Sequence, residues 1–374
     1  MNRSLLRLGW KGAAAGLLLF GASIAACAHT KDSAFERAIA KGARAETAGR
    51  SEEAYGEYER ARKLAENKPE RDYADELAVQ LAQKVLPKSD AMKRLAEIAY
   101  AKPPHRFSAH ALYQIGLARL EEGNDEQAQV TFEEVLTTFP ETAFGKRALQ
   151  QRLMSLDAIG PQEALTYLEA KEKVLATSVL IESIQYASAK RVEQLGRSAE
   201  ARARYVAIAK RFPYPFGDTF DDSLVRASEI AERAGDFTGA IQHLEDLLSV
   251  REVSSMMGTY QRPLFTRAEW HRAELYRDKL NNPSKAREVF YELYMTFRTS
   301  SKRDDALFEI ARIDKRTGRN PCYTWTRTLE EFPDSRYVPC VESVCKEKRL
   351  PRSRARPDCR HSLDGESPSS SVSP

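Results

Sequence analysis

The stretch AHALYQIGLARLEEGNDEQAQVTFEEVLTTFP, residues 109–140, decides the fold. It predicts two amphipathic helices, because apolar residues recur every three to four positions on both sides of Glu122-Gly123-Asn124. Gly116 and Ala128 are small residues in the apolar stripes, as closely packed helices need, and Phe132 is bulky enough to fill the gap beside them. One such hairpin cannot bury both of its apolar faces, so the fold depends on whether the hairpin recurs.

Similar segments recur along the whole chain. When the segments are aligned on the small residue that opens each second helix, seven alanines fall into register. Successive alanines lie about 36–39 residues apart, and the last two lie about 46 apart. An eighth, degenerate unit is predicted from helices over Asp305–Arg316 and Cys322–Phe332. The seven aligned alanines are Ala54, Ala91, Ala128, Ala164, Ala201, Ala240 and Ala286. Helical hairpins at this period are typical of a solenoid.

These residues resemble the tetratricopeptide repeat (TPR) family over roughly residues 35–333. Arg152 departs from the pattern, standing where the family has a first-helix glycine. The resemblance implies an all-α, right-handed solenoid of about eight helix–turn–helix units, with the spaced small and aromatic residues in its core. The units that carry the pattern best contain Gly42, Gly49, Ala54, Tyr58 and Ala61; Gly116, Gly123, Ala128, Phe132 and Pro140; and Gly196, Ala201, Tyr205 and Pro213.

The N-terminus has the layout of an export signal over residues 1–26. Arg3, Arg7 and Lys11 accompany a largely apolar run, Gly12–Ala26, that is short for a membrane span. A retained signal anchor is the alternative.

The junction Ile24-Ala25-Ala26-Cys27 resembles the lipobox of bacterial lipoproteins. The resemblance implies that Cys27 is acylated, for example with palmitate, and starts a short linker over residues 27–34. Several acyl chains on one cysteine form a stable membrane anchor. Ala28 follows where an aspartate would signal inner-membrane retention, so the resemblance implies the periplasmic face of the outer membrane.

Charge and motifs narrow the functional classes. The chain has 58 Lys and Arg against 54 Asp and Glu, a formal net charge of +4 that falls to about +1 without residues 1–26. That balance gives no electrostatic reason to expect nucleic acid. None of the six histidines belongs to a metal-ligand motif, and phosphate-loop and nucleophile-elbow motifs are missing from the sequence. We therefore expect no catalytic residue, metal, cofactor or small-molecule substrate, with an unrecognised hydrolase as the enzymatic alternative.

Four cysteines cluster near the C-terminus, at Cys322, Cys340, Cys345 and Cys359. An exported chain meets an oxidising compartment, and four cysteines permit three pairings. If Pro321–Phe332 and Arg336–Lys346 are antiparallel helices, Cys322 lies near Cys345, and Cys340 is left for Cys359. We predict these two disulfides, which would cap the open end of the solenoid over residues 35–346. Zinc is the rival, but the spacing lacks a Cys-x-x-Cys pair.

Partner-binding candidates come from first helices, which line the inner surface of such solenoids. Their non-core positions are polar and aromatic, without the run of Lys and Asn found in TPR proteins that recognise a terminal carboxylate. Each position is also explained as an ordinary surface residue. The candidates are His110, Tyr113 and Leu117; Tyr186 and Lys190; Val225 and Glu229; and His271 and Leu275.

Three segments interrupt the array. Met256, Met257 and Tyr260 in Ser249–Pro263 are adaptable contact residues or part of a loop folded on its own unit. The aromatic segment Phe212–Phe220 covers a helix end or offers a partner an anchor. Residues 347–374, basic and then Ser/Pro-rich, are interpreted as a disordered tail, solvated or touching acidic lipid or cell-wall polymer.

We predict a non-enzymatic scaffold for envelope proteins, held by its lipid. Similar TPR lipoproteins serve β-barrel assembly, pilus and secretin assembly, and gliding motility. The repeat ends Phe139-Pro140, Phe212-Pro213 and Phe332-Pro333 look like that group. The number of units favours a motility or secretion machine. The alternative is a cell-wall binding module that regulates peptidoglycan enzymes.

Overall fold

The computed structural model describes residues 33–250, 263–338 and 345, and over these residues it contains sixteen α-helices and no strand. The chain divides into two compact units, residues 1–152 and 153–374. The first unit contains α1 (Ala34–Thr47), α2 (Ser51–Leu64), α3 (Lys68–Val85), α4 (Lys88–Ala99), α5 (Ser108–Glu121) and α6 (Asp125–Thr138), and the division falls within α7 (Ala143–Asp157).

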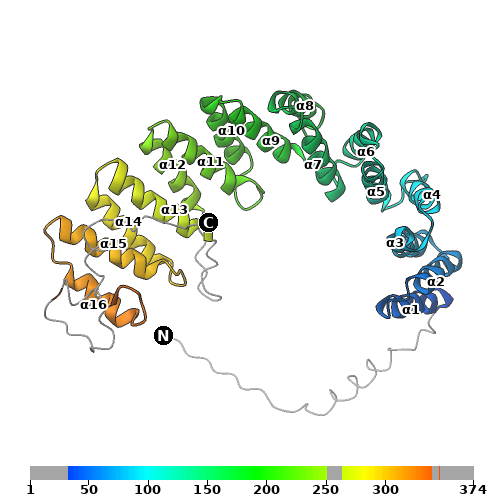
Figure 1. Ribbon diagram of the computed structural model, residues 1–374, viewed down its shortest axis with the longest axis horizontal. Coiled ribbons are helices and arrows are strands. Elements are labelled where there is room, and N and C mark those ends of the chain that lie inside the picture. The colour runs from blue at the N-terminus through cyan, green and yellow to red at the C-terminus, as the bar shows by residue number, and fades with distance from the viewer. Residues whose placement is uncertain (1–32, 251–262, 339–344, 346–374) are drawn as a thin grey trace, which may run out of the picture. The chain divides into compact units, whose positions relative to one another are not determined.

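The second unit continues the alternation of first and second helices (Figure 1). It contains α8 (Pro161–Val174), α9 (Ile181–Gln194), α10 (Ser198–Arg211), α11 (Phe220–Arg233), α12 (Phe237–Ser249), α13 (Pro263–Glu274), the π-helix η1 (Leu275–Lys279), α14 (Pro283–Thr296), α15 (Arg303–Arg316) and α16 (Cys322–Glu331). Helices adjacent in sequence pack against each other from α1 to α6 in the first unit and from α8 to α16 in the second. The predicted fold class, a solenoid of TPR-like helical hairpins, is confirmed.

The hairpin of α5 and α6 forms as the sequence predicts. Its turn is a Schellman motif, in which Gly123 N–H donates to Leu120 O (3.0 Å) and Asn124 N–H donates to Arg119 O (2.9 Å). Gly123 has φ of 75°, which glycine adopts without steric cost. The same pair of bonds ends α1, α9, α11 and α15, so one turn chemistry is repeated along the array.

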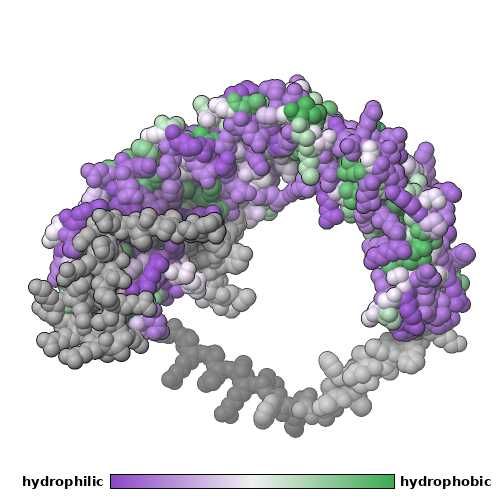
Figure 2. Space-filling model, in the orientation of Figure 1, coloured by the Kyte–Doolittle hydropathy of each residue, from purple (hydrophilic) through white to green (hydrophobic). Residues whose placement is uncertain are grey.

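Close approach between paired helices depends on small residues. A Cβ added to Gly116 would lie 2.5 Å from Cε1 of Phe132, whose ring is fully buried. All seven aligned alanines are buried, with at most 3% exposure. The interpretation of these positions as core is confirmed. Apolar side chains lie between helices, and on the face shown in Figure 2 hydrophobic residues appear as separate patches on a mainly hydrophilic surface.

The aromatic segment between α10 and α11 is divided between core and surface. Phe220 is buried, and Tyr214 packs against the same apolar cluster. Phe216 is 89% exposed. Phe212 packs against a neighbouring apolar cluster. Three of the four rings therefore pack against the core, and Phe216 is presented to solvent.

The end of the described chain differs from the prediction. A helix was expected over Arg336–Lys346, but Arg336 and Tyr337 lie in a turn. Tyr337 Oη donates to Asp305 Oδ1 (2.7 Å), and its ring stacks on Phe308 with centroids 4.1 Å apart. These contacts hold the chain across the start of α15. Proline follows Val338 in the sequence, and proline disfavours the α conformation in the residue before it.

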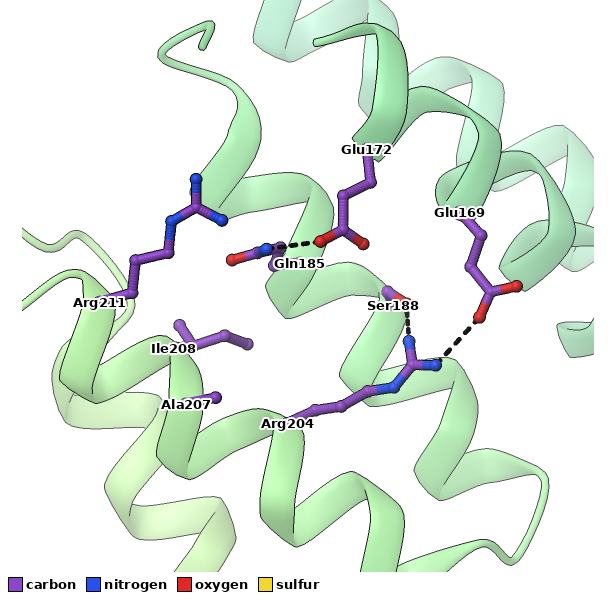
Figure 3. A pocket seen from close by; sticks show the side chains of 8 residues that line it. All are labelled: Glu169, Glu172, Gln185, Ser188, Arg204, Ala207, Ile208 and Arg211. Atoms are coloured by element: carbon purple, nitrogen blue, oxygen red, sulfur yellow. Dashed lines mark hydrogen bonds and ion pairs between the residues drawn. The ribbon is translucent and has the colours of Figure 1, made fainter. Parts of the chain in front are cut away.

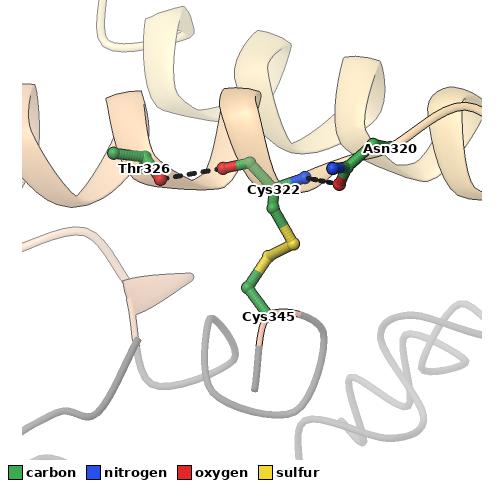
Figure 4. Close-up of a disulfide and its surroundings, with 4 residues drawn as sticks. All are labelled: Asn320, Cys322, Thr326 and Cys345. Carbon is green, nitrogen blue, oxygen red and sulfur yellow. Dashed lines mark hydrogen bonds between the residues drawn. A yellow bond between two sulfur atoms is a disulfide. The ribbon is translucent and has the colours of Figure 1, made fainter. Parts of the chain in front are cut away.

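Cys322 and Cys345 form a disulfide, the first of the two predicted pairs (Figure 4). Their Cα atoms are 5.5 Å apart, and Cys345 is buried beside Phe308 and Trp325. Both sulfurs are used in the bond, so these two cysteines are not zinc ligands here. Cys340 and Cys359 lie outside the described residues.

Candidate protein-binding surface

Charged pairs link successive first helices of the second unit. The partners lie 32 to 40 residues apart, about one repeat, so they join neighbouring hairpins. We call this series of pairs the charged ladder. The pairs are Asp157–Arg191, Glu193–Arg226 and Glu193–Arg233, Glu232–His271, and Arg277–Glu309. In the first three links the sequence signal is a carboxylate followed about one period later by a base, and in the last link the order is reversed.

A cleft of about 330 Å³ lies between α11 and α13, and we call it the α11–α13 cleft. Val225, Leu244 and Leu264 supply apolar lining, whereas carboxylates of α11 and α13 supply charge. An apolar site with a few polar groups is the usual form of a binding site. The other lining residues are Ser228, Glu229, Glu232, Arg267, Ala268, Trp270, His271 and Glu274.

His271 links both helices of this cleft. Its Nε2 lies 2.7 Å from Glu232 Oε2 on α11, and its Nδ1 lies 3.5 Å from Glu274 Oε2 on its own helix. Hydrogen bonding to Glu274 and Glu232 raises the pKa of His271 above its ordinary value, against the opposing effect of burial. The protonated form therefore holds α11 and α13 together.

We expect the His271→Gln variant to lose more stability at pH 6 than at pH 8.5. The folded pKa is raised, so the stabilisation is fully present below the unfolded value of about 6.5 and is lost as pH rises through the folded value. Urea midpoints at both pH values measure the effect. His110→Gln is the control with the opposite trend, because burial lowers the pKa of His110. An equal loss at both pH values for His271→Gln would contradict this assignment.

Tyr186 and Lys190 lie on α9. The Tyr186 ring is half-buried, 5.6 Å from the Tyr205 ring, and burial raises the pKa of its hydroxyl. Asp222 and Arg226 of α11 act electrostatically on that hydroxyl, so this face adjoins the next first helix. Lys190 is exposed.

His110 and Tyr113 come together on α5 of the first unit. Both contact Phe144: His110 stacks on it at 4.6 Å between centroids, and Tyr113 lies at 5.7 Å. Tyr113 is only 7% exposed and Leu275 of η1 only 1%, so their prediction as non-core positions is wrong. Each side chain packs between hairpins instead of facing outward. Met256, Met257 and Tyr260 lie outside the described residues.

A second cleft, of about 380 Å³, lies among α8, α9 and α10 (Figure 3). Arg204 donates from Nη1 to Ser188 Oγ (2.5 Å) and from Nη2 to Glu169 Oε1 (2.9 Å). Gln185 donates to Glu172 Oε1 (2.5 Å). These polar groups bind one another across the cleft, and their hydrogen bonds connect α9 to α8 and α10 to both.

In the part of the chain that the structure describes, no group of three or more His, Cys, Asp or Glu residues is arranged to hold a metal ion. Within the same residues, none of the helices combines the length and hydropathy needed to cross a bilayer.

The helices are arranged as in a helical-repeat scaffold. Among known protein families, the tetratricopeptide repeat family matches residues 110–142, which cover most of the α5–α6 hairpin. TPR repeats are typical of proteins that bind other proteins and are typically not catalytic. Curated proteins give no significant match.

Solved structures with similar helix arrangements include Pseudomonas aeruginosa PilF, at 17% identity and TM-score 0.35, over 64% of this chain and 97% of that one. PilW, titled a type IV pilus biogenesis factor, is 16% identical with TM-score 0.34, over 63% and 98%. A Parabacteroides merdae tetratricopeptide repeat protein is 13% identical with TM-score 0.33, over 74% and 98%.

Proposed function

We propose that this protein is a non-enzymatic scaffold that binds envelope proteins through its first-helix face. The observation that carries the proposal is the α11–α13 cleft, where apolar side chains from neighbouring repeats lie beside charged ones. Repeat solenoids use such extended faces to hold partners. The cleft is large enough for a few side chains of a partner, and the charges around it would fix the orientation of that partner.

We further propose that Cys27 carries lipid and holds the scaffold at the periplasmic face of the outer membrane. The lipobox-like junction and the preceding basic and apolar segment support this. The scaffold then acts as an adaptor in an assembly machine of the envelope, of the gliding motility, pilus, secretion or outer-membrane protein assembly kind. The Phe-Pro repeat ends support that choice.

Site-specific photocrosslinking tests the scaffold. A photoreactive amino acid in place of Glu229, which lines the cleft, is expected to yield discrete adducts with envelope proteins. The matched control is Gln242, exposed on α12, the second helix of the same hairpin. Identical adducts from both positions, or none from Glu229, would contradict the proposal. Adducts with peptidoglycan enzymes alone would favour the cell-wall alternative.

The anchor has its own test. Cys27→Ser is expected to move the protein from the membrane fraction to the soluble periplasm, since the acyl chains are its proposed anchor. Fractionation and immunoblotting measure the change, and Cys359→Ser is the matched control that should stay with the membrane. Retention of the Cys27→Ser protein in the membrane fraction would refute lipid anchoring.

A further inference from the structure

A third cleft adjoins the α11–α13 cleft on the other side of α13. It has a volume of about 440 Å³ and lies between α13 and the α14–α15 connection, and we call it the cationic cleft. Its lining combines two bases, four hydroxyl-bearing residues and one tryptophan, without a carboxylate. These residues are Thr266, Arg267, Trp270, Thr299, Ser300, Ser301 and Lys302.

Arg267 is exposed at the junction of the two clefts and lines both. Most first-helix arginines of this unit form ion pairs, as Arg226 and Arg272 do. Among the described residues, Arg267 has no carboxylate within ion-pair distance. An arginine without such a pair, in a cleft that also contains Lys302, is suited to an anionic group.

The tryptophan distinguishes among anionic ligands. The Lys302 ammonium lies 4.8 Å from the centroid of the Trp270 ring. The Phe290 ring packs edge-on against the same indole, with 5.0 Å between the ring centroids. Trp270 Nε1 donates to Glu274 Oε1 (2.7 Å). The indole is thus already engaged and is poorly placed to stack on a sugar. Beyond Trp270 and Arg267, the α11–α13 cleft offers Val225, Leu244 and Leu264 to apolar side chains.

We propose that the two clefts together bind a protein segment in which acidic residues lie next to an apolar residue. Aspartate or glutamate enters the cationic cleft, beside Arg267 and Lys302, and the apolar side chain enters the α11–α13 cleft. This assignment rests on the proposed scaffold function and specifies the chemistry of the partner. Charge complementarity provides the selectivity, because the lining of the cationic cleft contains Arg267 and Lys302 and no carboxylate. The Lys302 ammonium also lies 3.0 Å from Asp305 Oδ2, behind that lining, so Arg267 is the cation that contributes most to the selectivity.

Selection of peptides tests the assignment. A random twelve-residue library displayed on phage is panned against the immobilised full chain, and an enriched peptide is then titrated by fluorescence anisotropy. We expect enrichment of Asp and Glu next to apolar residues. Arg267→Ala and Lys302→Ala should each weaken binding about tenfold. Arg298→Ala is the matched control and should bind normally, because Arg298 is exposed in the same connection and lines neither cleft.

Several outcomes would overturn the assignment: enrichment of Lys and Arg, no enrichment above the starting library, or equal affinity for wild type and Arg267→Ala. Arg267-dependent binding of an oligogalacturonate, without selection of acidic peptides, would replace the peptide by an anionic glycan. If photocrosslinking at position 229 yields protein adducts but the phage selection enriches no acidic peptides, only the proposed ligand class is refuted. If the selection enriches acidic peptides but photocrosslinking yields no adducts, only the scaffold function is refuted.

Discussion

Replacement of Phe132 by alanine is expected to lower the free energy of unfolding of the α5–α6 hairpin by about 3–5 kcal/mol. The ring is fully buried and fills the space beside Gly116, where the two helices approach most closely. Removing it leaves a cavity that the flanking hairpins can close only in part. Hydrogen exchange of amides in α5 and α6 measures the local loss, which matters because repeat arrays can unfold in parts.

A double-mutant cycle separates this packing from general destabilisation. Gly116→Ala alone should cost about 1–3 kcal/mol, because the new methyl group would lie within contact distance of a ring that cannot move away. Phe132→Leu replaces the ring by a shorter side chain that lacks Cε1, the atom that the new methyl group would approach. The two changes together should therefore cost less than their sum. If the two losses in free energy of unfolding are strictly additive, Gly116 and Phe132 are not in direct contact in the folded hairpin.

Loss of the Cys322–Cys345 disulfide is expected to destabilise the last hairpin by about 3–4 kcal/mol. The bond closes a segment with a sequence separation of 23 and ties Cys345 against Phe308 and Trp325. Among the described residues, the hairpin of α15 and α16 packs against another hairpin on one side only, through α14. A crosslink therefore contributes more to its stability than it would to that of an internal hairpin. The Cys322→Ser/Cys345→Ser variant should show faster hydrogen exchange in α16 and in the adjoining α15.

Reductant provides the control for the disulfide. Wild type in reductant should match the double variant in oxidising buffer, and reductant should not change the double variant further. An additional effect of reductant would be attributed to Cys340 and Cys359. Unchanged exchange in α16 of the double variant would contradict a capping role.

The fold was predictable because its causes are local and repeated. A small alanine recurs in seven second helices where backbones approach, and a glycine with positive φ recurs in five of the hairpin turns, so a period alone locates most of the hairpins. The error at Arg336 has a local cause too: the helix assumed over Arg336–Lys346 for the disulfide pairing left out of account the proline that follows Val338. The actual turn is selected by Asp305, about 30 residues earlier, which binds Arg336 and Tyr337.

The candidate surface was less predictable because its contacts join different repeats. His271 was predicted as a candidate from its position within its own repeat. Its partner Glu232 lies 39 residues away, in the preceding repeat, and was not predicted. Tyr113 has a surface offset, yet Phe144 of the next hairpin covers it. The cationic cleft escaped detection altogether, because α13 supplies one wall and the Thr299–Lys302 connection supplies the other. Single-repeat patterns contain no information on such pairs.

The charged ladder has a consequence for how such a chain can evolve. In three successive links the acid belongs to the earlier hairpin and the base to the later one, but Arg277 and Glu309 reverse that order. The hairpin formed by α13, η1 and α14 consequently presents a base to each neighbour, His271 to one and Arg277 to the other. Duplicating it in tandem would place base against base, whereas duplicating the α9–α10 hairpin would again oppose an acid to a base. Growth of the array by copying single hairpins is therefore favoured before α13 and disfavoured at it.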